Sequence, residues 1–331
     1  MTGARVKVLY IAGSGRSGST ILDRILGQLD GFFSAGELCN LWDRGLLDHR
    51  KCGCGVPVDQ CPTWTGILAT GFGRQLDQAD ATRVIALRRG WVRVRHIPKV
   101  LATHWRRPAD GDELLGVLGR LYGAVQAHTG CRVIVDSSKA PLYAELLARS
   151  PVVDLHVVHL VRDPRATAYS WLRKKQLPDF GDVRQMQRLP PLKSSGLWTL
   201  WQTMSEVLVG RPRDRYLRLR YEDFVRDPRA AVQRVTALVG EQPPALPFQS
   251  ASTVRLQATH SVSGNPNRFE TGTVHLRPDS EWVNGLHGAQ RALVTAVTWP
   301  LLLRYRYPIR VRRTAPTEIA DHHSVRSGGR P

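Results

Sequence analysis

No run of apolar residues in this chain is long enough to cross a lipid bilayer as a helix. The longest, Ala292 to Leu303, is interrupted by Thr295, Thr298 and Pro300 and falls short of the roughly 20 residues that a transmembrane helix needs. The first apolar run, Val6 to Ala12, is too short for the core of a secretory signal and no cleavage site follows it. We therefore expect a soluble, cytoplasmic protein.

Acidic residues are scarce: 28 Asp and Glu stand against 47 Lys and Arg among 331 residues, so the formal net charge is +19. Such a chain attracts anions, whether nucleic acid, anionic lipid or a polyanionic small molecule. It has none of the zinc-finger, RNP or heptad-flanked basic patterns of a nucleic-acid reader, and we expect no specific nucleic-acid partner. Much of the excess lies near the C-terminus, in a basic region that could touch a membrane surface: Arg304, Arg306, Arg310, Arg312 and Arg313.

Cysteines are also few, but three of the five, Cys52, Cys54 and Cys61, lie close together, with Cys39 and His49 nearby. These donors would suffice for a tetrahedral zinc site, although Cys-x-Cys-x6-Cys is not a common zinc-finger spacing. Buried, reduced thiols are the alternative in a cytoplasmic protein. We assign no residue to a metal, and both interpretations stay open; a metal here would be structural.

Four apolar segments are typical of strands buried on both faces of a sheet. They are Val6 to Ala12, Arg132 to Asp136, Asp154 to Val161 and Tyr216 to Tyr221. Long segments with helical patterns separate them, which favours parallel βαβ units. We predict an α/β fold with a central, mostly parallel sheet and helices on both faces.

Polar clusters accompany the ends of these strands, where sheets of this kind bind ligands. We expect four of them to share one edge of the sheet: residues 13–20, 136–139, 162–165 and 221–223. Segments of about 40–115 and 172–200 are predicted to be insertions that cap this edge. The whole of residues 1–312 would form one domain, followed by a basic tail over 313–331 that we predict to be disordered.

The segment Gly13-Ser14-Gly15-Arg16-Ser17-Gly18-Ser19-Thr20 follows the first strand, and helical spacing predicts a helix after it that closes near Gly31. Gly13 and Gly18 bracket four residues as in a Walker A loop, whose backbone N–H groups hold an anion. The Walker A lysine is missing, because Ser19 stands in its place, which argues against nucleoside triphosphate hydrolysis. The cation is Arg16, whose guanidinium suits a bidentate contact to phosphate or sulfate.

Two motifs together resemble those of bacterial-type sulfotransferases that use 3′-phosphoadenosine-5′-phosphosulfate (PAPS). Arg16 to Thr20 is similar to their 5′-phosphosulfate loop, and Leu160 to Ser170, with Arg162 after a strand and Ser170 eight residues on, looks like their 3′-phosphate motif. The resemblance implies a P-loop NTPase-like sulfotransferase fold, PAPS as co-substrate and no required metal. It assigns the following residues to cofactor binding: Gly15, Arg16, Ser17, Gly18, Ser19, Thr20, Arg162, Ser170, Tyr221 and Arg268.

The last two of these residues come from segments later in the chain. Arg220 to Asp223 is similar to the family's Tyr-Glu-Asp segment, whose Tyr lies against the adenine, and Tyr221 is carried over on that basis. Gly264 to Phe269 occupies the place of the family's late basic loop without its Arg-Lys-Gly form, and Arg268 is the cation there.

Three residues are assigned catalytic roles. Sulfuryl transfer needs in-line positioning and charge stabilisation, and Arg16 would stabilise the leaving phosphate. Lys139 stands where the family often carries a lysine that touches the transferring sulfate. Glu37 lies in a segment resembling that of the catalytic Glu of tyrosylprotein sulfotransferases; we expect it to be the base, with a pKa raised by burial beside two phenylalanines. Reserve candidates for the base are His104, His159 and His260.

The predicted function is transfer of a sulfuryl group from PAPS to a hydroxyl of a small-molecule, carbohydrate or lipid acceptor. One alternative is a P-loop kinase-like phosphotransferase, which would need the Walker A lysine and a carboxylate that holds Mg²⁺. Another is a non-catalytic protein that binds nucleotides or polyanions through its charge. Tryptophans of the capping segments could stack on a sugar or aromatic acceptor: Trp91, Trp105, Trp171, Trp198 and Trp201.

Overall fold

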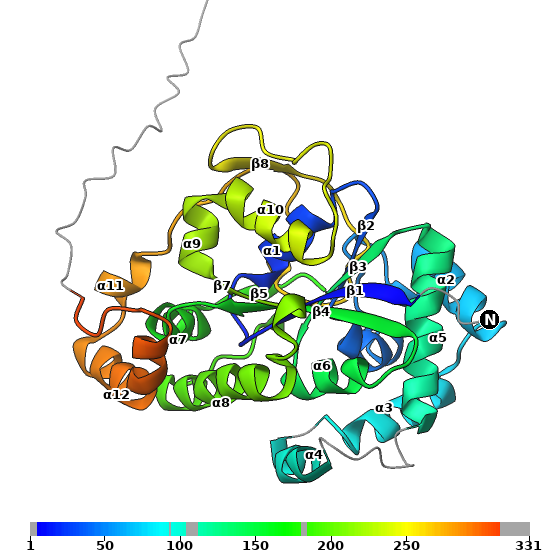
Figure 1. The fold of residues 1–331 in the computed structure, drawn as a ribbon, viewed down its shortest axis with the longest axis horizontal. Helices are drawn as coiled ribbons and strands as arrows, with labels where there is room; N and C mark the ends of the chain where they lie inside the picture. The colour runs from blue at the N-terminus through cyan, green and yellow to red at the C-terminus, as the bar shows by residue number, and fades with distance from the viewer. Residues whose placement is uncertain (1–4, 93, 104–111, 180–183, 312–331) are drawn as a thin grey trace, which may run out of the picture.

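The computed structural model describes residues 5–92, 94–103, 112–179 and 184–311. Its centre is a five-stranded parallel sheet in the order β2-β3-β1-β4-β7 (Figure 1). The strands are Val6–Ala12 (β1), Phe32–Gly36 (β2), Val133–Lys139 (β3), Val153–Val161 (β4) and Tyr216–Arg220 (β7). The predicted α/β fold and its four predicted strands are confirmed, and β2 is an additional strand.

Helices cover both faces of the sheet (Figure 1). On one face lie α1 (Ser19–Leu26), α9 (Tyr221–Arg226) and α10 (Pro228–Leu238), and on the other α5 (Asp112–Thr129), α6 (Pro141–Ala148) and α8 (Pro191–Val209). Alternate residues of β1 serve the two cores: Leu9 and Ile11 pack with α1, whereas Val8 and Tyr10 pack with α5 and α6. This is why β1 has a continuous apolar sequence.

The predicted helix after the first loop is shorter than expected. It ends at Leu26, with Gly27 as its C-cap, instead of continuing to Gly31. Gly27 lies close to β2, because a Cβ there would lie 2.3 Å from the Cβ of Ser34. The chain turns at Gly31, which has a φ of 75°, and then pairs with β3 as strand β2. The sequence signal for β2 was weak because Phe32 and Phe33 are its only large apolar residues.

The remaining elements surround the carboxyl edge and the two ends of the sheet. The first predicted capping segment contains η1 (Leu38–Asn40), η2 (Leu41–Leu47), η3 (Val58–Gln60), α2 (Pro62–Phe72), α3 (Gln78–Arg89), η4 (Val94–His96) and α4 (Ile97–Thr103). The second follows α7 (Pro164–Leu172) and contains the short antiparallel strands β5 (Gln176–Leu177) and β6 (Arg184–Gln185). Elsewhere lie η6 (Arg213–Arg215), β8 (Thr253–Leu256), η7 (Pro266–Phe269), β9 (Gly272–His275), α11 (Glu281–Gly285) and α12 (Gly288–Arg304).

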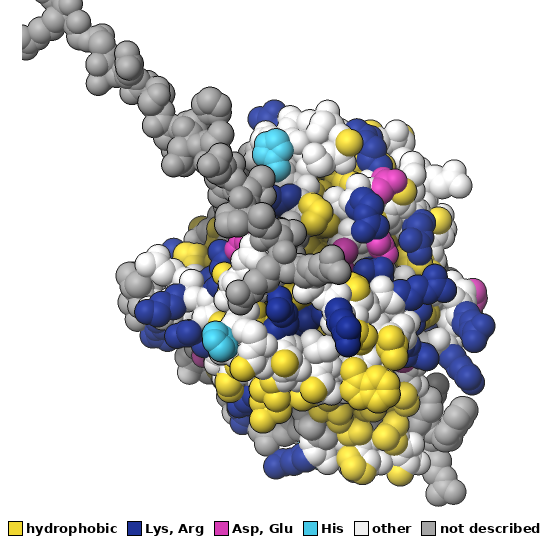
Figure 2. All heavy atoms as spheres, turned by 90° about the vertical axis from the view of Figure 1, so that its left-hand side faces the viewer, with side chains coloured by type: hydrophobic (Ala, Val, Ile, Leu, Met, Phe, Trp, Pro, Cys, Tyr) yellow, Lys and Arg dark blue, Asp and Glu magenta, His cyan; other side chains and the backbone are white. Residues whose placement is uncertain are grey.

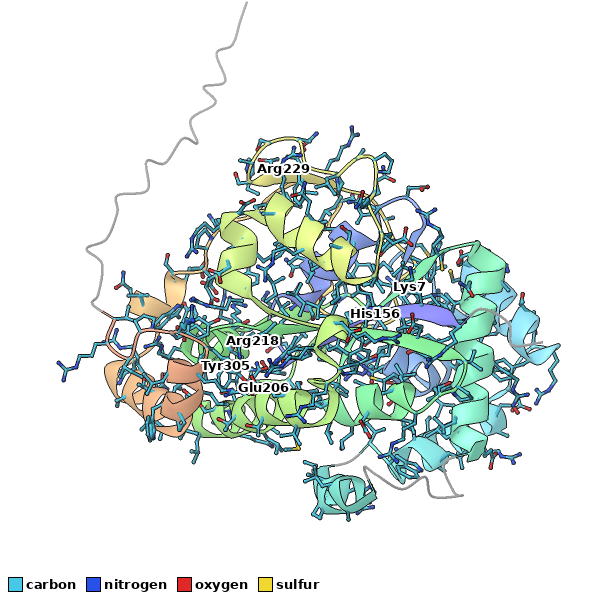
Figure 3. The ribbon with its side chains drawn as sticks, viewed as in Figure 1. Lys7, His156, Glu206, Arg218, Arg229 and Tyr305 are labelled. Atoms are coloured by element: carbon cyan, nitrogen blue, oxygen red, sulfur yellow. The ribbon has the colours of Figure 1, made fainter. Side chains whose placement is uncertain are left out.

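A group of charged and aromatic side chains holds the C-terminal helix against the sheet. Figure 3 shows Glu206 of α8, Arg218 of β7 and Tyr305, which follows α12, gathered at one junction. Arg218 Nη1 lies 3.2 Å from Glu206 Oε1, and its guanidinium carbon lies 5.2 Å from the centre of the Tyr305 ring. The end of α12 is thereby joined to both α8 and the edge strand β7.

Hydrophobic side chains gather on the face of the molecule that carries α12 (Figure 2). Within α12, Leu293, Trp299 and Leu303 are exposed. In the part of the chain that the structure describes, no helix is long and apolar enough to pass through a bilayer. The predicted tail over 313–331, together with Arg312, Arg313, His104 and Trp105, lies outside the described residues. The expected membrane contact through the basic C-terminal region stays a prediction.

Candidate active site

The glycine-rich loop between β1 and α1 has a backbone that its glycines make possible. Gly13, Arg16 and Gly18 have φ values of 135°, 67° and 91°, in the region that favours glycine. A Cβ on Gly13 would lie 2.4 Å from the Leu160 carbonyl oxygen, and one on Gly18 would lie 2.4 Å from the Tyr221 ring. The loop therefore packs tightly and leads into α1, whose first backbone N–H groups lack helical partners and attract an anion.

Several polar atoms of this loop are buried yet have no hydrogen-bond partner among the described residues. They are Ser14 Oγ, Ser17 Oγ and the Nε and Nη2 atoms of Arg16. Arg16 is held by the Trp171 ring, 4.7 Å from its guanidinium carbon, and its Nη1 donates to Met186 Sδ at 3.3 Å. Because unpaired buried donors are costly, this loop fits an anionic ligand that accepts from them.

A second cation, Arg162, lies beside the loop at the end of β4. Its Nη1 donates to the Arg16 carbonyl at 2.8 Å, and its guanidinium carbon lies 4.7 Å from the centre of the Tyr221 ring. Its Nη2 donates to Asp279, whereas its Nε has no partner in the described part of the chain. Ser170 of α7 borders the same cavity. The ion pair with Asp279 was not foreseen, since 117 residues separate the two in sequence.

Glu37 and Lys139 meet on the other side of the loop. Lys139 Nζ donates to Glu37 Oε1 at 2.5 Å and to the Ser137 carbonyl at 2.9 Å. Asn40 donates to Glu37 Oε2 at 2.7 Å, and Arg44 lies 3.6 Å from the same oxygen. Burial acts to raise the pKa of Glu37, but the positive charges of Lys139 and Arg44 outweigh it, and the pKa is lower than usual. The expected rise in this pKa was therefore wrong, and the carboxylate is ionised.

Beneath Lys139, a buried polar layer fixes the end of β3. Asp136 accepts hydrogen bonds from the Ser138 backbone N–H at 2.8 Å and from the Tyr122 hydroxyl. Burial raises its pKa to about 6. The Cys39 backbone N–H donates to Ser138 Oγ at 3.0 Å, so this cysteine belongs to the active-site framework and not to the cluster formed by the other cysteines near it in sequence.

One cavity of about 1320 Å³ joins these groups. Its walls include the loop, Arg162, Ser170, Tyr221, Glu37 and Lys139. Both predicted capping segments contribute to it, the first through Asn40, Arg44, Arg88 and Val92, and the second through Lys175, Met186, Leu189 and Trp198. Of the tryptophans suggested for stacking, Trp171 and Trp201 also border the cavity, while Trp91 is buried in the core.

One expected cofactor-binding residue and two reserve candidates for the base do not border this cavity. Arg268 is fully buried, lies 3.1 Å from Asp179, donates to the Lys51 carbonyl at 2.7 Å and does not border the cavity, so its expected role in cofactor binding stays a prediction. His159 is buried in β4 between Tyr216 and Gln202, and burial lowers its pKa to about 4. His260 faces the sulfur atoms of Cys52 and Cys61. Neither of these two histidines is placed to act as the base.

The fold and the site define an α/β protein that brings a glycine loop, a helix N-terminus and two arginines to one cavity at the carboxyl edge of its sheet. Comparison with known proteins adds the family. The chain belongs to the sulfotransferase family, whose model matches residues 9–243. This range contains all the proposed site residues except Arg268, and membership supports a transferase. The predicted family is confirmed.

Solved structures share the fold. The sulfotransferase domain of the Synechococcus PCC 7002 olefin synthase is 21% identical, with a TM-score of 0.51 over 91% of this chain and 95% of that one. The sulfotransferase domain from the curacin biosynthetic pathway is 16% identical, with a TM-score of 0.50 over 93% of this chain and 100% of that one. No curated protein sequence matches the chain. The predicted sulfotransferase fold is confirmed.

Proposed function

We propose that this sulfotransferase transfers a sulfuryl group from PAPS to a hydroxyl of an acceptor with an apolar body, such as a small molecule or a lipid. One observation carries the proposal. Buried, unpaired donors of Arg16, Ser14 and Arg162 border the same cavity as the Glu37 and Lys139 pair. This arrangement supports an anionic donor on one side and a proton acceptor on the other, with space for a second substrate between them.

The two phosphates of the donor would be bound by different groups. We assign the 5′-phosphosulfate to Arg16 and the amides of residues 18–20, and the 3′-phosphate to Arg162 and Ser170. Tyr221, whose ring packs against Gly18 and Arg162, would lie against the adenine. The guanidinium of Arg16 has two nitrogen atoms without a partner among the described residues, Nε and Nη2, which suits the bidentate recognition of phosphate or sulfate.

In the reaction, the acceptor oxygen forms a bond to sulfur while the bond from sulfur to the phosphate oxygen breaks. The positive charge of Arg16 and the N-terminus of α1 would stabilise the leaving phosphate. The hydroxyl proton would pass to Glu37, which Lys139 and Arg44 keep ionised. Lys139 would then contact the transferring sulfuryl oxygens from its position 2.5 Å from Glu37. These steps use positioning, charge stabilisation and one proton transfer, and none of them requires a metal.

The lining of the cavity beyond this pair supports an apolar acceptor. Leu142 follows Lys139 by three residues, and Leu189, Trp201 and Met204 border the cavity from α8 and the segment before it. Apolar walls favour the burial of hydrocarbon and exclude water. A polar carbohydrate would leave its hydroxyl groups unpaired against such walls, so we rank it below a lipid or an apolar small molecule.

The test is isothermal titration with the desulfated product, 3′-phosphoadenosine-5′-phosphate (PAP), with 5′-AMP and ATP as comparators. We expect PAP to bind without metal and at least about tenfold more tightly than either comparator, because each phosphate contact contributes a charge-assisted hydrogen bond. Arg162→Ala should remove this preference. Arg229→Ala is the matched control, because Arg229 lies on α10 (Figure 3) and does not border the cavity. Equal affinity for PAP and 5′-AMP, or a Mg²⁺-dependent preference for ATP, would overturn the proposal in favour of a binding module or a kinase.

A further inference from the structure

Three cysteines and one histidine converge outside the candidate active site. Cys52, Cys54 and Cys61 come from the segment between η2 and α2, whereas His260 comes from the loop between β8 and η7. Their four ligand atoms all lie within 4.8 Å of one another. His49, which is close in sequence, instead pairs with Asp59. The fourth donor thus comes from about 200 residues further along the chain.

Three of the six distances between these donor atoms are close to those of a tetrahedron around one ion. Sγ of Cys54 lies 3.7 Å from Sγ of Cys61, and Nδ1 of His260 lies 3.3 Å from Sγ of Cys61 and 3.9 Å from Sγ of Cys52. Zinc binds sulfur at about 2.3 Å and imidazole nitrogen at about 2.0 Å, so tetrahedral geometry predicts about 3.8 Å between two sulfurs and about 3.6 Å between sulfur and nitrogen. The four donors therefore surround a space of the right size.

Local structure orients the sulfur atoms. A tight turn presents Cys52 and Cys54, in which Gly55 has a φ of 95° and its N–H donates to the Cys52 carbonyl at 2.8 Å. Cys61 is the N-cap of α2, where the helix N-terminus stabilises negative charge.

The histidine is equally well positioned. Its backbone carbonyl accepts a 2.6 Å hydrogen bond from Trp64 Nε1, which ties His260 to α2. Gly53 lets the two segments approach, because a Cβ there would lie 2.5 Å from the Thr259 carbonyl oxygen. A disulfide would use only two of the three thiols and would leave the third thiol and the imidazole unexplained.

We propose that Cys52, Cys54, Cys61 and His260 form a structural zinc site that none of the comparisons assigns. Four protein ligands close the coordination sphere, so the site has no open position for catalysis. The ligands identify the metal class, since three thiolates and one imidazole select zinc over magnesium, calcium or manganese.

The site would brace the backbone that carries Glu37. Two residues beyond His260, the Val262 carbonyl accepts from the Glu37 N–H at 2.7 Å, and the Val262 N–H donates to the Ala35 carbonyl at 2.9 Å. The Gly53 N–H donates to the Ser261 carbonyl at 3.0 Å. The metal would therefore lock this loop between the cysteine segment and the end of β2. This positioning role rests on the function proposed above, whereas the metal site does not.

Metal content and spectroscopy test the site without any activity assay. The full chain, purified under reducing conditions, should contain one zinc ion per molecule when its metal content is measured by inductively coupled plasma mass spectrometry. After exchange with cobalt it should show the visible absorption of tetrahedral Co²⁺ and a thiolate charge-transfer band. Cys54→Ser and His260→Ala should lose or alter these bands. Cys131→Ser, which removes a buried cysteine outside the cluster, should leave them unchanged.

Wild-type results decide the question if the ligand variants fail to fold. X-ray absorption should then show three sulfur ligands and one nitrogen ligand around the bound metal. A folded, reduced protein that takes up neither zinc nor cobalt would overturn the proposal, as would peptide mapping that finds a disulfide between Cys54 and Cys61 in the native protein. Because PAP binding is measured separately, a failure of this site and a failure of the proposed function give different results.

Discussion

The ion pair between Arg162 and Asp279 makes a quantitative prediction about donor binding. Asp279 occupies one nitrogen of the guanidinium that we assign to the 3′-phosphate, so the two anions compete for it. Asp279→Asn removes the competing charge but preserves shape, and its side-chain oxygen can still accept the 3.2 Å hydrogen bond from the Glu281 N–H. We therefore expect this substitution to increase the affinity for PAP.

The expected size follows from the burial of the pair. The side chains of Arg162 and Asp279 are 10% and 19% exposed. A charge-assisted bond in this partly screened setting contributes about 1 to 2 kcal/mol, which corresponds to roughly 5- to 30-fold in the dissociation constant. Isothermal titration of wild type and Asp279→Asn with PAP and with 5′-AMP measures the effect, because 5′-AMP lacks the 3′-phosphate and reports only the general change in charge.

The reasoning would be refuted by a weaker affinity for PAP in Asp279→Asn, which would mean that Asp279 helps to build the site. An equal gain for PAP and 5′-AMP would refute it as well, because the effect would then be independent of the 3′-phosphate. In the double variant with Arg162→Ala, the gain should disappear, since no cation remains for which the two anions compete.

Three further predictions concern the proposed base, the glycine loop and one buried acid. Glu37→Gln should lower kcat by about 10²- to 10⁴-fold and leave the affinity for PAP nearly unchanged. Because Lys139 lowers the pKa of Glu37, the pH profile of wild-type kcat/KM should show no acid limb from this group above about pH 5. Gly18→Ala should weaken PAP binding and lower Tm more than Gly73→Ala, because both have positive φ but only the former would meet a neighbouring ring; equal losses would contradict the packing argument. Burial raises the pKa of Asp23 to about 7, so the native state retains a proton that the unfolded chain releases near pH 4, and stability falls as pH rises from about 4 to 7. Urea melts of wild type at pH 5 and pH 8 should show the part of this fall between pH 5 and 7, about 3 kcal/mol at most, and Asp23→Asn should reduce it.

Features carried by contiguous residues were readable from the sequence. The apolar run of β1, the glycine loop and the helix α1 follow one another within about twenty residues. In the same way, Arg162 lies in the short loop between the strand β4 and the helix α7. Parallel strands place their carboxyl ends at one edge, so the convergence of Arg16 and Arg162 on one cavity was a consequence of the predicted fold. Strand β2 was missed because its two phenylalanines are too short a signal and because its pairing partner, β3, lies about 100 residues away.

By itself, the sequence determined the α/β class, the sulfotransferase family, the anion loop and most of the residues that face it, because these depend on local conformation and on the order of the strands. Only the tertiary structure decided which charges meet. It paired Glu37 with Lys139 and so lowered a pKa that burial alone would raise. It turned Arg268 toward Asp179 and brought His260 to the cysteines. Such contacts depend on how distant loops pack, and a side chain's charge, partner and role follow from the groups that packing places within a few ångströms of it.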